Sequence, residues 1–225
     1  MNNVRKSKRT SVTINPDLLA LPHGYLAFKR VADSLVAGIG LVIASPLWIV
    51  AALAILLEDG LPVFFTQERV GKFGVTFRLI KFRTMRKGDN QVLDIPLEKD
   101  PRVTRVGRIL RATALDELPT LIHILKGDIS FVGPKALAPI VYDDTDPDHG
   151  KSIHEVQGFE LRSRVSPGLT GLAQVYASKN CPYRHKFRYD SIYIKHLAFG
   201  LDIKLIAMSF LRTFIGGWEK TSRRH

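Results

Sequence analysis

An uncharged, mostly apolar segment of 24 residues, from Ser34 to Leu57, constrains this chain more than any other feature. As an α-helix it would be about 36 Å long at 1.5 Å per residue, which is enough to cross a bilayer. Proline removes a backbone donor and clashes with the preceding turn, so Ser45-Pro46 at mid-segment predicts a kink. We therefore expect a membrane protein with a bent N-terminal helix.

The charges that flank this segment leave two topologies open. A spanning helix usually shows a bias of Lys and Arg to one side. Here Lys29 and Arg30 precede the segment, whereas Arg69 and Lys72 follow it. From the residues alone, a kinked transmembrane helix and a re-entrant helix that bends at Pro46 and returns to the same face fit about equally well.

The net charge indicates an anionic partner. The chain has 33 Lys and Arg against 21 Asp and Glu, a formal +12, which suits acidic lipid, nucleic acid or a phosphorylated substrate. Cys181 is the only cysteine, which excludes an intrachain disulfide and a CxxC metal site. The polar, basic N-terminus shows no cleavable signal peptide.

Two adjacent carboxylates, Asp116 and Glu117, are the candidate reactive groups. Pro119 is tolerated only near a helix start, so we expect both in the first turn of the apolar helix that ends at Gly127. The helix dipole favours an ionised carboxylate there, and such a group is a nucleophile or a metal ligand. The alternative is an ordinary capped surface helix.

Four arginines precede these carboxylates at every third position: Arg102, Arg105, Arg108 and Arg111. This spacing predicts a short helix or turn with most of the guanidinium groups on one broad face. Such a cluster suits bidentate binding of phosphate, and a solvated helix face is the alternative.

Other segments predict a small β element and interfacial helices. Residues 63–65 and 75–82 are rich in aromatic and branched side chains, and Gly71 and Gly74 between them indicate a hairpin. Residues 87–101 are polar and turn-rich, which predicts a mobile loop. Residues 197–218 are apolar but interrupted by charges, which predicts an interfacial helix or packing on the core.

Several sequence blocks, in this order, closely resemble the bacterial sugar transferase family, the monotopic phosphoglycosyl transferases. The resemblance extends from about Lys29 to about Leu211. It rests on Phe65-Thr66-Gln67-Glu68-Arg69-Val70-Gly71, Lys81-Phe82-Arg83-Thr84-Met85, Leu115-Asp116-Glu117-Leu118-Pro119, Gly127-Asp128-Ile129-Ser130-Phe131-Val132-Gly133-Pro134-Lys135 and Ser166-Pro167-Gly168-Leu169-Thr170-Gly171-Leu172-Ala173-Gln174.

The resemblance implies an irregular, mostly helical α/β fold in a monotopic membrane protein. It favours the re-entrant helix bent at Ser45 and Pro46. We expect a flexible basic arm (1–24), a re-entrant membrane helix (25–58) and a catalytic domain with interfacial helices (59–225). We also expect this minimal form of the family to lie on the cytoplasmic face of the bacterial inner membrane.

The resemblance also implies transfer of a sugar 1-phosphate from a nucleotide sugar, such as a UDP-sugar, to a polyprenyl phosphate such as undecaprenyl phosphate. This would be the first membrane step of polysaccharide or glycoconjugate synthesis. Asp116 matches the nucleophile that forms a phosphosugar intermediate, and Glu117 assists it. Both carboxylates are expected to bind Mg²⁺ or Mn²⁺. The phosphate-binding candidates are Lys81, Arg83, Arg111 and Lys135.

Two departures from the family pattern concern the donor site. Lys135-Ala136 stands where the family usually has Arg-Pro, and lysine keeps the charge but loses the guanidinium fork. Residues 176–180 replace a block that usually contains Gly-Arg.

Two other interpretations stay open. One is a membrane-anchored basic protein that binds acidic lipid or nucleic acid without catalysis, although no nucleic-acid-binding motif is present. The other is an inactive scaffold of an envelope assembly, against which the intact carboxylate pair argues. Membrane lipid is an expected partner, and a homo-oligomer is compatible with the sequence.

Overall fold

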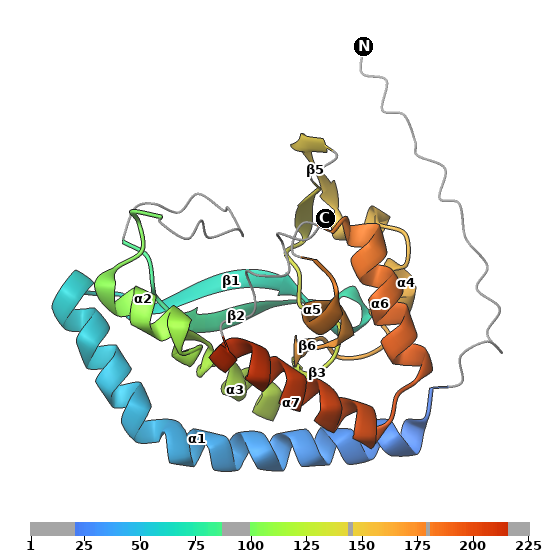
Figure 1. Cartoon of the computed structure of the whole chain (residues 1–225), viewed down its shortest axis with the longest axis horizontal. Coiled ribbons are helices and arrows are strands. Elements are labelled where there is room, and N and C mark those ends of the chain that lie inside the picture. Colours follow the sequence, from blue (N-terminus) through green and yellow to red (C-terminus); the bar gives the residue numbers. More distant parts are fainter. Residues whose placement is uncertain (1–20, 87–99, 144–145, 179–180, 216–225) are drawn as a thin grey trace.

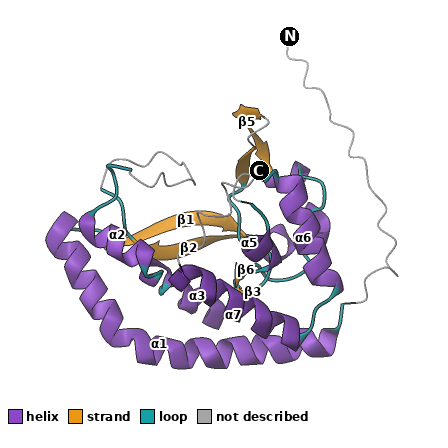
Figure 2. Cartoon of the chain, in the orientation of Figure 1, coloured by secondary structure: helices purple, strands orange, loops and turns teal. Residues whose placement is uncertain are grey.

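The computed structural model describes residues 21–86, 100–143, 146–178 and 181–215 (Figure 1). Most of the expected basic arm (1–24) and of the polar loop (87–101) lies outside these residues. The described part contains three two-stranded sheets. Helices make up most of it (Figure 2). The expectation of a mostly helical fold with a small β element is therefore confirmed.

The first element, α1, is one 37-residue helix, His23–Asp59, which changes direction near its middle (Figure 1). Pro46 lies inside it and has no N–H to donate to the carbonyl of Val42, four residues earlier. The Ser45 hydroxyl donates to this same carbonyl at 2.8 Å. Serine thus supplies the hydrogen bond that proline removes, so the helix continues through the bend.

The elements after α1 fold back on it. They are β1 (Phe64–Val70), η2 (Lys72–Gly74), β2 (Thr76–Phe82), α2 (Arg105–Ala112), η3 (Leu115–Glu117), α3 (Thr120–Lys126), β3 (Ser130–Val132), β4 (Ile140–Asp143), β5 (Asp146–Ser152), η4 (Ile153–Glu155), α4 (Phe159–Arg162), β6 (Gly168–Thr170), α5 (Leu172–Tyr176), α6 (Tyr183–Lys195) and α7 (Phe199–Ile215). The sheets are β1–β2 and β4–β5, both antiparallel, and the parallel pair β3–β6. The predicted hairpin, the short arginine-rich helix and a C-terminal helix are all present.

Small side chains on α1 form the face that packs against the domain. Ala37, Ala44 and Ala51 recur every seven residues and are buried. Ala37 packs in one cluster with Leu79 of β2 and Ile124 of α3. The opposite face is exposed and apolar; it includes Leu35, Val36, Ile39, Val42, Ile43, Ile49, Val50 and Leu53. Within the described residues, α1 alone is long and apolar enough to cross a membrane.

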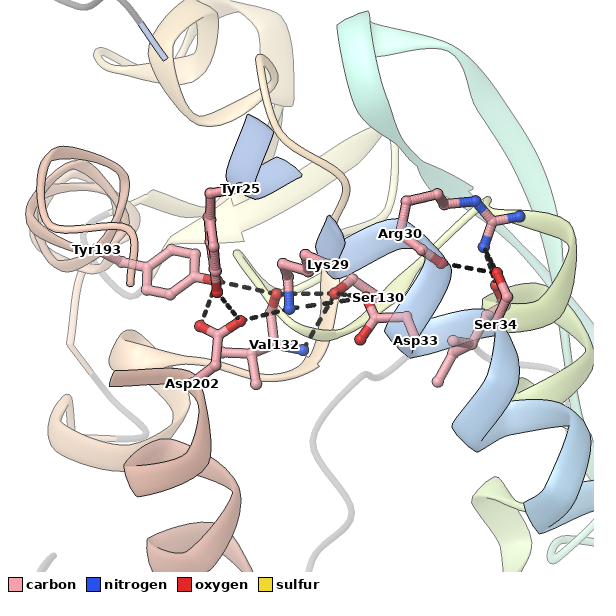
Figure 3. A network of polar contacts seen from close by, with 10 residues as sticks. Tyr25, Lys29, Arg30, Asp33, Ser34, Ser130, Val132, Tyr193 and Asp202 are labelled. Carbon is pink, nitrogen blue, oxygen red and sulfur yellow. Dashed lines mark hydrogen bonds and ion pairs between the residues drawn. The ribbon is translucent and has the colours of Figure 1, made fainter. Parts of the chain in front are cut away.

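The N-terminal end of α1 joins the domain through a buried polar network (Figure 3). Lys29 Nζ lies 2.5 Å from Asp202 Oδ2 of α7; the Asp202 side chain is buried and the Lys29 side chain is largely buried. The hydroxyls of Tyr25 and Tyr193 also donate to Asp202, at 2.7 and 2.8 Å. A buried ion pair is stable only when its remaining lone pairs are satisfied, and the two tyrosines do this. The network therefore fastens α1 to α6 and α7.

Charged residues near both ends of α1 also cap other helices. Arg30 donates from Nη1 and Nη2 to the carbonyls of Ile124 and Leu125, at 2.7 and 2.8 Å, which satisfies the C-terminal end of α3. At the other end, Glu58 accepts from the backbone N–H groups of Arg105 and Val106, both at 2.8 Å. These contacts fix α1 to α2 and α3 on either side of the apolar segment.

Glycines allow two of the sequence blocks quoted above to meet as β3 and β6. A Cβ on Gly168 would lie 2.0 Å from the backbone nitrogen of Gly133, and one on Gly171 would lie 2.1 Å from the Gly133 carbonyl oxygen. No side chain fits at these distances. The backbone of β6 therefore lies directly on the loop that leads to Lys135.

Gly107 gives the first testable prediction, because α2 approaches the backbone after β2 at this point. A Cβ on Gly107 would lie 2.1 Å from the Thr84 carbonyl oxygen. We expect Gly107→Ala to lower stability by about 1–3 kcal/mol, as overpacking does, and to lower the thermal midpoint in detergent. Gly200→Ala is the matched control, because nothing lies within 4 Å of the added methyl in α7. Equal midpoints for the two variants would contradict this packing.

Candidate active site

Asp116 and Glu117 lie in η3, a 3₁₀ turn of its own between α2 and α3. The sequence-based expectation placed them in the first turn of the apolar helix, and this was wrong in detail. Pro119 is the N-cap residue of α3, which starts only at Thr120 and ends at Gly127 as expected. Ala114, just before the turn, has a left-handed backbone with φ 57°, which redirects the chain and presents both carboxylates ahead of α3.

Two cations from neighbouring elements face these carboxylates. Lys81 of β2 forms an ion pair with Glu117. Arg111 of α2 donates from Nε to the hydroxyl of Thr84 at 2.8 Å, which orients its guanidinium. Both Lys81 and Arg111 stabilise the charge of Asp116. The fold thus brings together four of the predicted site residues from three different elements.

The pKa of Asp116 is raised to about 6. Burial is the largest cause, and the charge of the neighbouring Glu117 carboxylate acts in the same direction. The charges of Lys81 and Arg111 act in the opposite direction but do not outweigh burial. We expected the helix dipole to hold this carboxylate ionised, whereas desolvation dominates. The group is still mostly ionised at pH 7, and its pKa lies in the range where an enzyme group can change protonation state.

The arginine cluster divides between the site and the solvent. Arg105 and Arg108 are exposed on α2. Arg102 is paired instead with Asp100, with Nη2 to Oδ2 at 2.6 Å, and these hydrogen bonds lower the pKa of Asp100 to about 2. Arg111 is the member of the cluster that faces Asp116. The three-residue spacing predicted the helix correctly but could not show which arginine points inward.

Arg83 and Lys135 occupy other surroundings. Arg83 Nη2 lies 2.8 Å from the carbonyl oxygens of Asp59 and Gly60 and 2.9 Å from Asp59 Oδ2, so this guanidinium caps the end of α1. Lys135 is exposed on the loop after β3, and its carbonyl accepts from buried Arg162 at 2.6 Å. The phosphate-binding roles of Arg83 and Lys135 stay predictions.

The donor set suits a hard divalent ion. Mg²⁺ retains several waters and needs only one or two carboxylates from the protein, a requirement that Asp116 and Glu117 meet. In the described part of the chain, no group of three or more His, Cys, Asp or Glu side chains is placed to hold a metal. A structural zinc site among these residues is therefore not supported.

Two buried residues near the site are not singled out by the sequence pattern. Thr84 orients Arg111, as described above, and its backbone carbonyl accepts from Thr104 at 3.1 Å. His123 occupies a core position of α3 and bonds to the backbone of β2 at Ile80. His123 interrupts the apolar run 121–125, and this interruption was the sequence signal that could have identified it.

Comparison with known proteins identifies the family. Residues 24–216 match the family described as "Bacterial sugar transferase". This match covers most of the chain, so the chain belongs to the bacterial sugar transferase family. The resemblance inferred from the sequence blocks is confirmed.

Three relatives indicate how this chain compares with whole proteins of the family. It is 38% identical to "UDP-N-acetylgalactosamine-undecaprenyl-phosphate N-acetylgalactosaminephosphotransferase" of Aeromonas hydrophila, over 88% of this chain and 46% of that protein. It is 34% identical to "Exopolysaccharide production protein ExoY" of Rhizobium meliloti (strain 1021), over 82% and 84%. The ExoY protein of Sinorhizobium fredii is 32% identical over 92% and 94%. The chain thus spans about half of the first relative and most of the two ExoY proteins.

The raised pKa of Asp116 predicts that its charge lowers the stability of the fold. A carboxyl whose folded pKa is raised stabilises the protein below its unfolded value near 4, and this contribution is lost as pH rises through about 6. We expect Asp116→Asn to be about 1–3 kcal/mol more stable than the wild type at pH 8, with the gain vanishing near pH 4. Thermal midpoints across this range are the measurement; a destabilised variant at pH 8 would contradict the assignment.

Proposed function

We propose that this chain transfers a sugar 1-phosphate from a nucleotide diphospho-sugar to a polyprenyl phosphate, with Asp116 as the covalent nucleophile. The names of several relatives describe undecaprenyl-phosphate sugar phosphotransferases, most of them for UDP-sugars. The observation that carries the proposal is Asp116, desolvated beside Glu117 and flanked by Lys81 and Arg111. A pair of cations around one reactive carboxylate suits attack on a diphosphate.

The proposed reaction has two steps. In the first, an Asp116 carboxylate oxygen attacks the phosphorus that carries the sugar, the bond to the bridging oxygen breaks, and a nucleoside monophosphate leaves. In the second, a phosphate oxygen of the polyprenyl phosphate attacks the phosphosugar-aspartate, which forms a diphosphate lipid and restores the carboxylate. Lys81 and Arg111 would stabilise the charge on the equatorial oxygens in both steps, and Glu117 would hold Lys81 in place.

We propose Mg²⁺ or Mn²⁺ as the cofactor, held by Asp116 and Glu117. When bound, such an ion neutralises the diphosphate of the donor and polarises its phosphoryl oxygens. The chain contributes only two adjacent carboxylates to this site, so phosphate and water oxygens would complete the coordination.

We further propose that α1 enters and leaves the same leaflet, with both chain termini on the cytoplasmic face of a bacterial inner membrane. Support comes from the contacts at the two ends of α1. Lys29 binds Asp202 near one end, and Glu58 and Asp59 bind α2 and Arg83 at the other. A spanning helix would separate these ends by the thickness of the bilayer, about 30 Å, yet one domain bonds to both.

The nucleophile prediction is tested by trapping the intermediate. Enzyme incubated with the donor alone is expected to gain one phosphosugar on the peptide that holds Asp116, as measured by mass spectrometry. Asp116→Asn keeps the shape but removes the attacking charge, so nucleoside monophosphate release should fall at least a thousandfold, about 4 kcal/mol of transition-state stabilisation. Normal turnover in this variant would refute the assignment.

Chelation adds a second arm to the same experiment. Excess chelator should abolish nucleoside monophosphate release, and added Mg²⁺ should restore it. A basic protein that binds acidic lipid or nucleic acid without catalysis would show salt-sensitive binding but no product in either condition. Full activity in chelator would remove the metal from the proposal while leaving the nucleophile in place.

The topology prediction uses a membrane-impermeant thiol reagent on intact cells. In a Cys181→Ser background, a single cysteine introduced near residue 5 should stay unlabelled until the membrane is permeabilised. Pro46→Leu restores a backbone N–H at the bend, so it should favour a spanning helix and expose this cysteine to the reagent. Labelling of the protein with an intact Pro46 from outside would show that α1 spans the membrane.

A further inference from the structure

A buried histidine links the strand of the catalytic lysine to the helix that follows the carboxylates. His123 of α3 is 4% exposed. Its Nε2 atom lies 3.2 Å from the backbone nitrogen of Ile80 in β2, and its Nδ1 atom lies 2.8 Å from Asp128 Oδ2. Each ring nitrogen therefore has one partner, and the two partners belong to different segments of the chain.

These partners determine the tautomer of the ring. The backbone N–H of Ile80 is always a donor, so Nε2 of His123 must accept and carries no proton. The imidazole proton is then on Nδ1, where it is donated to the Asp128 carboxylate. The Asp128 contact holds both the tautomer and the orientation that the Ile80 contact needs.

The bond to Ile80 also gives one backbone N–H of β2 an acceptor outside the β1–β2 sheet. β1 and β2 form a two-stranded sheet, so in the described structure the other edge of β2 has no strand beside it. His123 supplies an acceptor on this edge. An unpaired backbone N–H at a half-buried position would cost about 1–3 kcal/mol.

The same bond sets the position of the catalytic cation. Ile80 directly precedes Lys81, whose ammonium pairs with Glu117. On the other side, the hydroxyl of Thr120, the first residue of α3, donates to the Glu117 carbonyl at 2.6 Å. The hydrogen bond from Ile80 to His123 therefore connects α3, the helix that directly follows the carboxylates, to the strand that holds the cation.

We propose that His123, oriented by Asp128, is a positioning residue that holds Lys81 against Glu117 and beside Asp116. The effect on turnover rests on the proposed function, whereas the effect on the placement of Lys81 does not. His123 acts through the backbone of β2 and touches neither reacting group.

Two substitutions separate the two ring contacts. His123→Gln places an amide oxygen near the position of Nε2 and can still accept from Ile80. His123→Asn reaches only the position of Nδ1 and cannot. We expect kcat/KM for the donor to fall about 10–100-fold in His123→Asn, as for other supporting hydrogen-bond partners, and to recover largely in His123→Gln. His196→Asn, at an exposed histidine after α6, is the control and should match the wild type.

A double-mutant cycle shows whether His123 acts through the lysine. In a Lys81→Met background the histidine has no ammonium left to position, so His123→Asn should cause no further loss of kcat/KM. If the factors by which the two substitutions lower kcat/KM multiply in the double variant, His123 affects the fold independently of Lys81. The proposal would then be overturned.

A chemical probe tests the placement of Lys81 without turnover. Reductive methylation of the enzyme without substrate, followed by mass spectrometry, should modify Lys81 several times faster in His123→Asn than in the wild type, because the ammonium is released from Glu117. If His123→Asn does not fold, Asp128→Ala removes the partner of Nδ1 at a more exposed site and should have the same effect. Asp128→Asn keeps an acceptor and should not.

If the rate of Lys81 methylation is the same as in the wild type in every folded variant among His123→Asn and Asp128→Ala, the proposal is overturned. If methylation changes as expected but the wild type releases no nucleoside monophosphate, the positioning role stands and the proposed function fails. The two outcomes are therefore distinguishable.

Discussion

The attachment of α1 to one domain at both of its ends is the constraint on which the rest of this structure depends. Lys29 and Asp202 form a buried ion pair near one end, and Arg83 caps the other end at Asp59. Charges removed from water must be paired, so separating either end of α1 from the domain would leave a costly unpaired charge. Because β2 and α2 are fixed near the second end, the strand of Lys81 and the helix of Arg111 converge on the same turn.

The site combines a destabilising arrangement with supports that hold it. Asp116 is desolvated next to another carboxylate, and Ala114 adopts a left-handed backbone that costs a non-glycine residue about 1–2 kcal/mol. Supporting hydrogen bonds offset this cost: Thr84 orients Arg111, and His123 pairs with β2. This pattern, in which local strain is maintained by surrounding structure, is typical of functional sites.

Local patterns in the sequence predicted individual elements well. Alternating aromatic and branched residues with Gly71 and Gly74 predicted the β1–β2 hairpin, and Gly127 ends α3 as expected. Pro46 predicted the bend in α1, and the Ser45 hydroxyl donates to the Val42 carbonyl at this bend. These features depend on the backbone preferences of a few neighbouring residues, so short stretches of sequence suffice to predict them.

The sequence by itself determined the long apolar segment, the carboxylate pair and the family, because hydrophobicity, spacing and motif order are properties of the chain. Only the tertiary structure decided which charges serve the site. Arg83 lies in one of the sequence blocks that resemble the family, yet its side chain caps the end of α1. His123 lies in an apolar run, yet its ring accepts a hydrogen bond from the backbone of β2. The tertiary structure also decided that the pKa of Asp116 is raised and not lowered. Desolvation depends on what packs around a group, and side chains distant in sequence supply that packing.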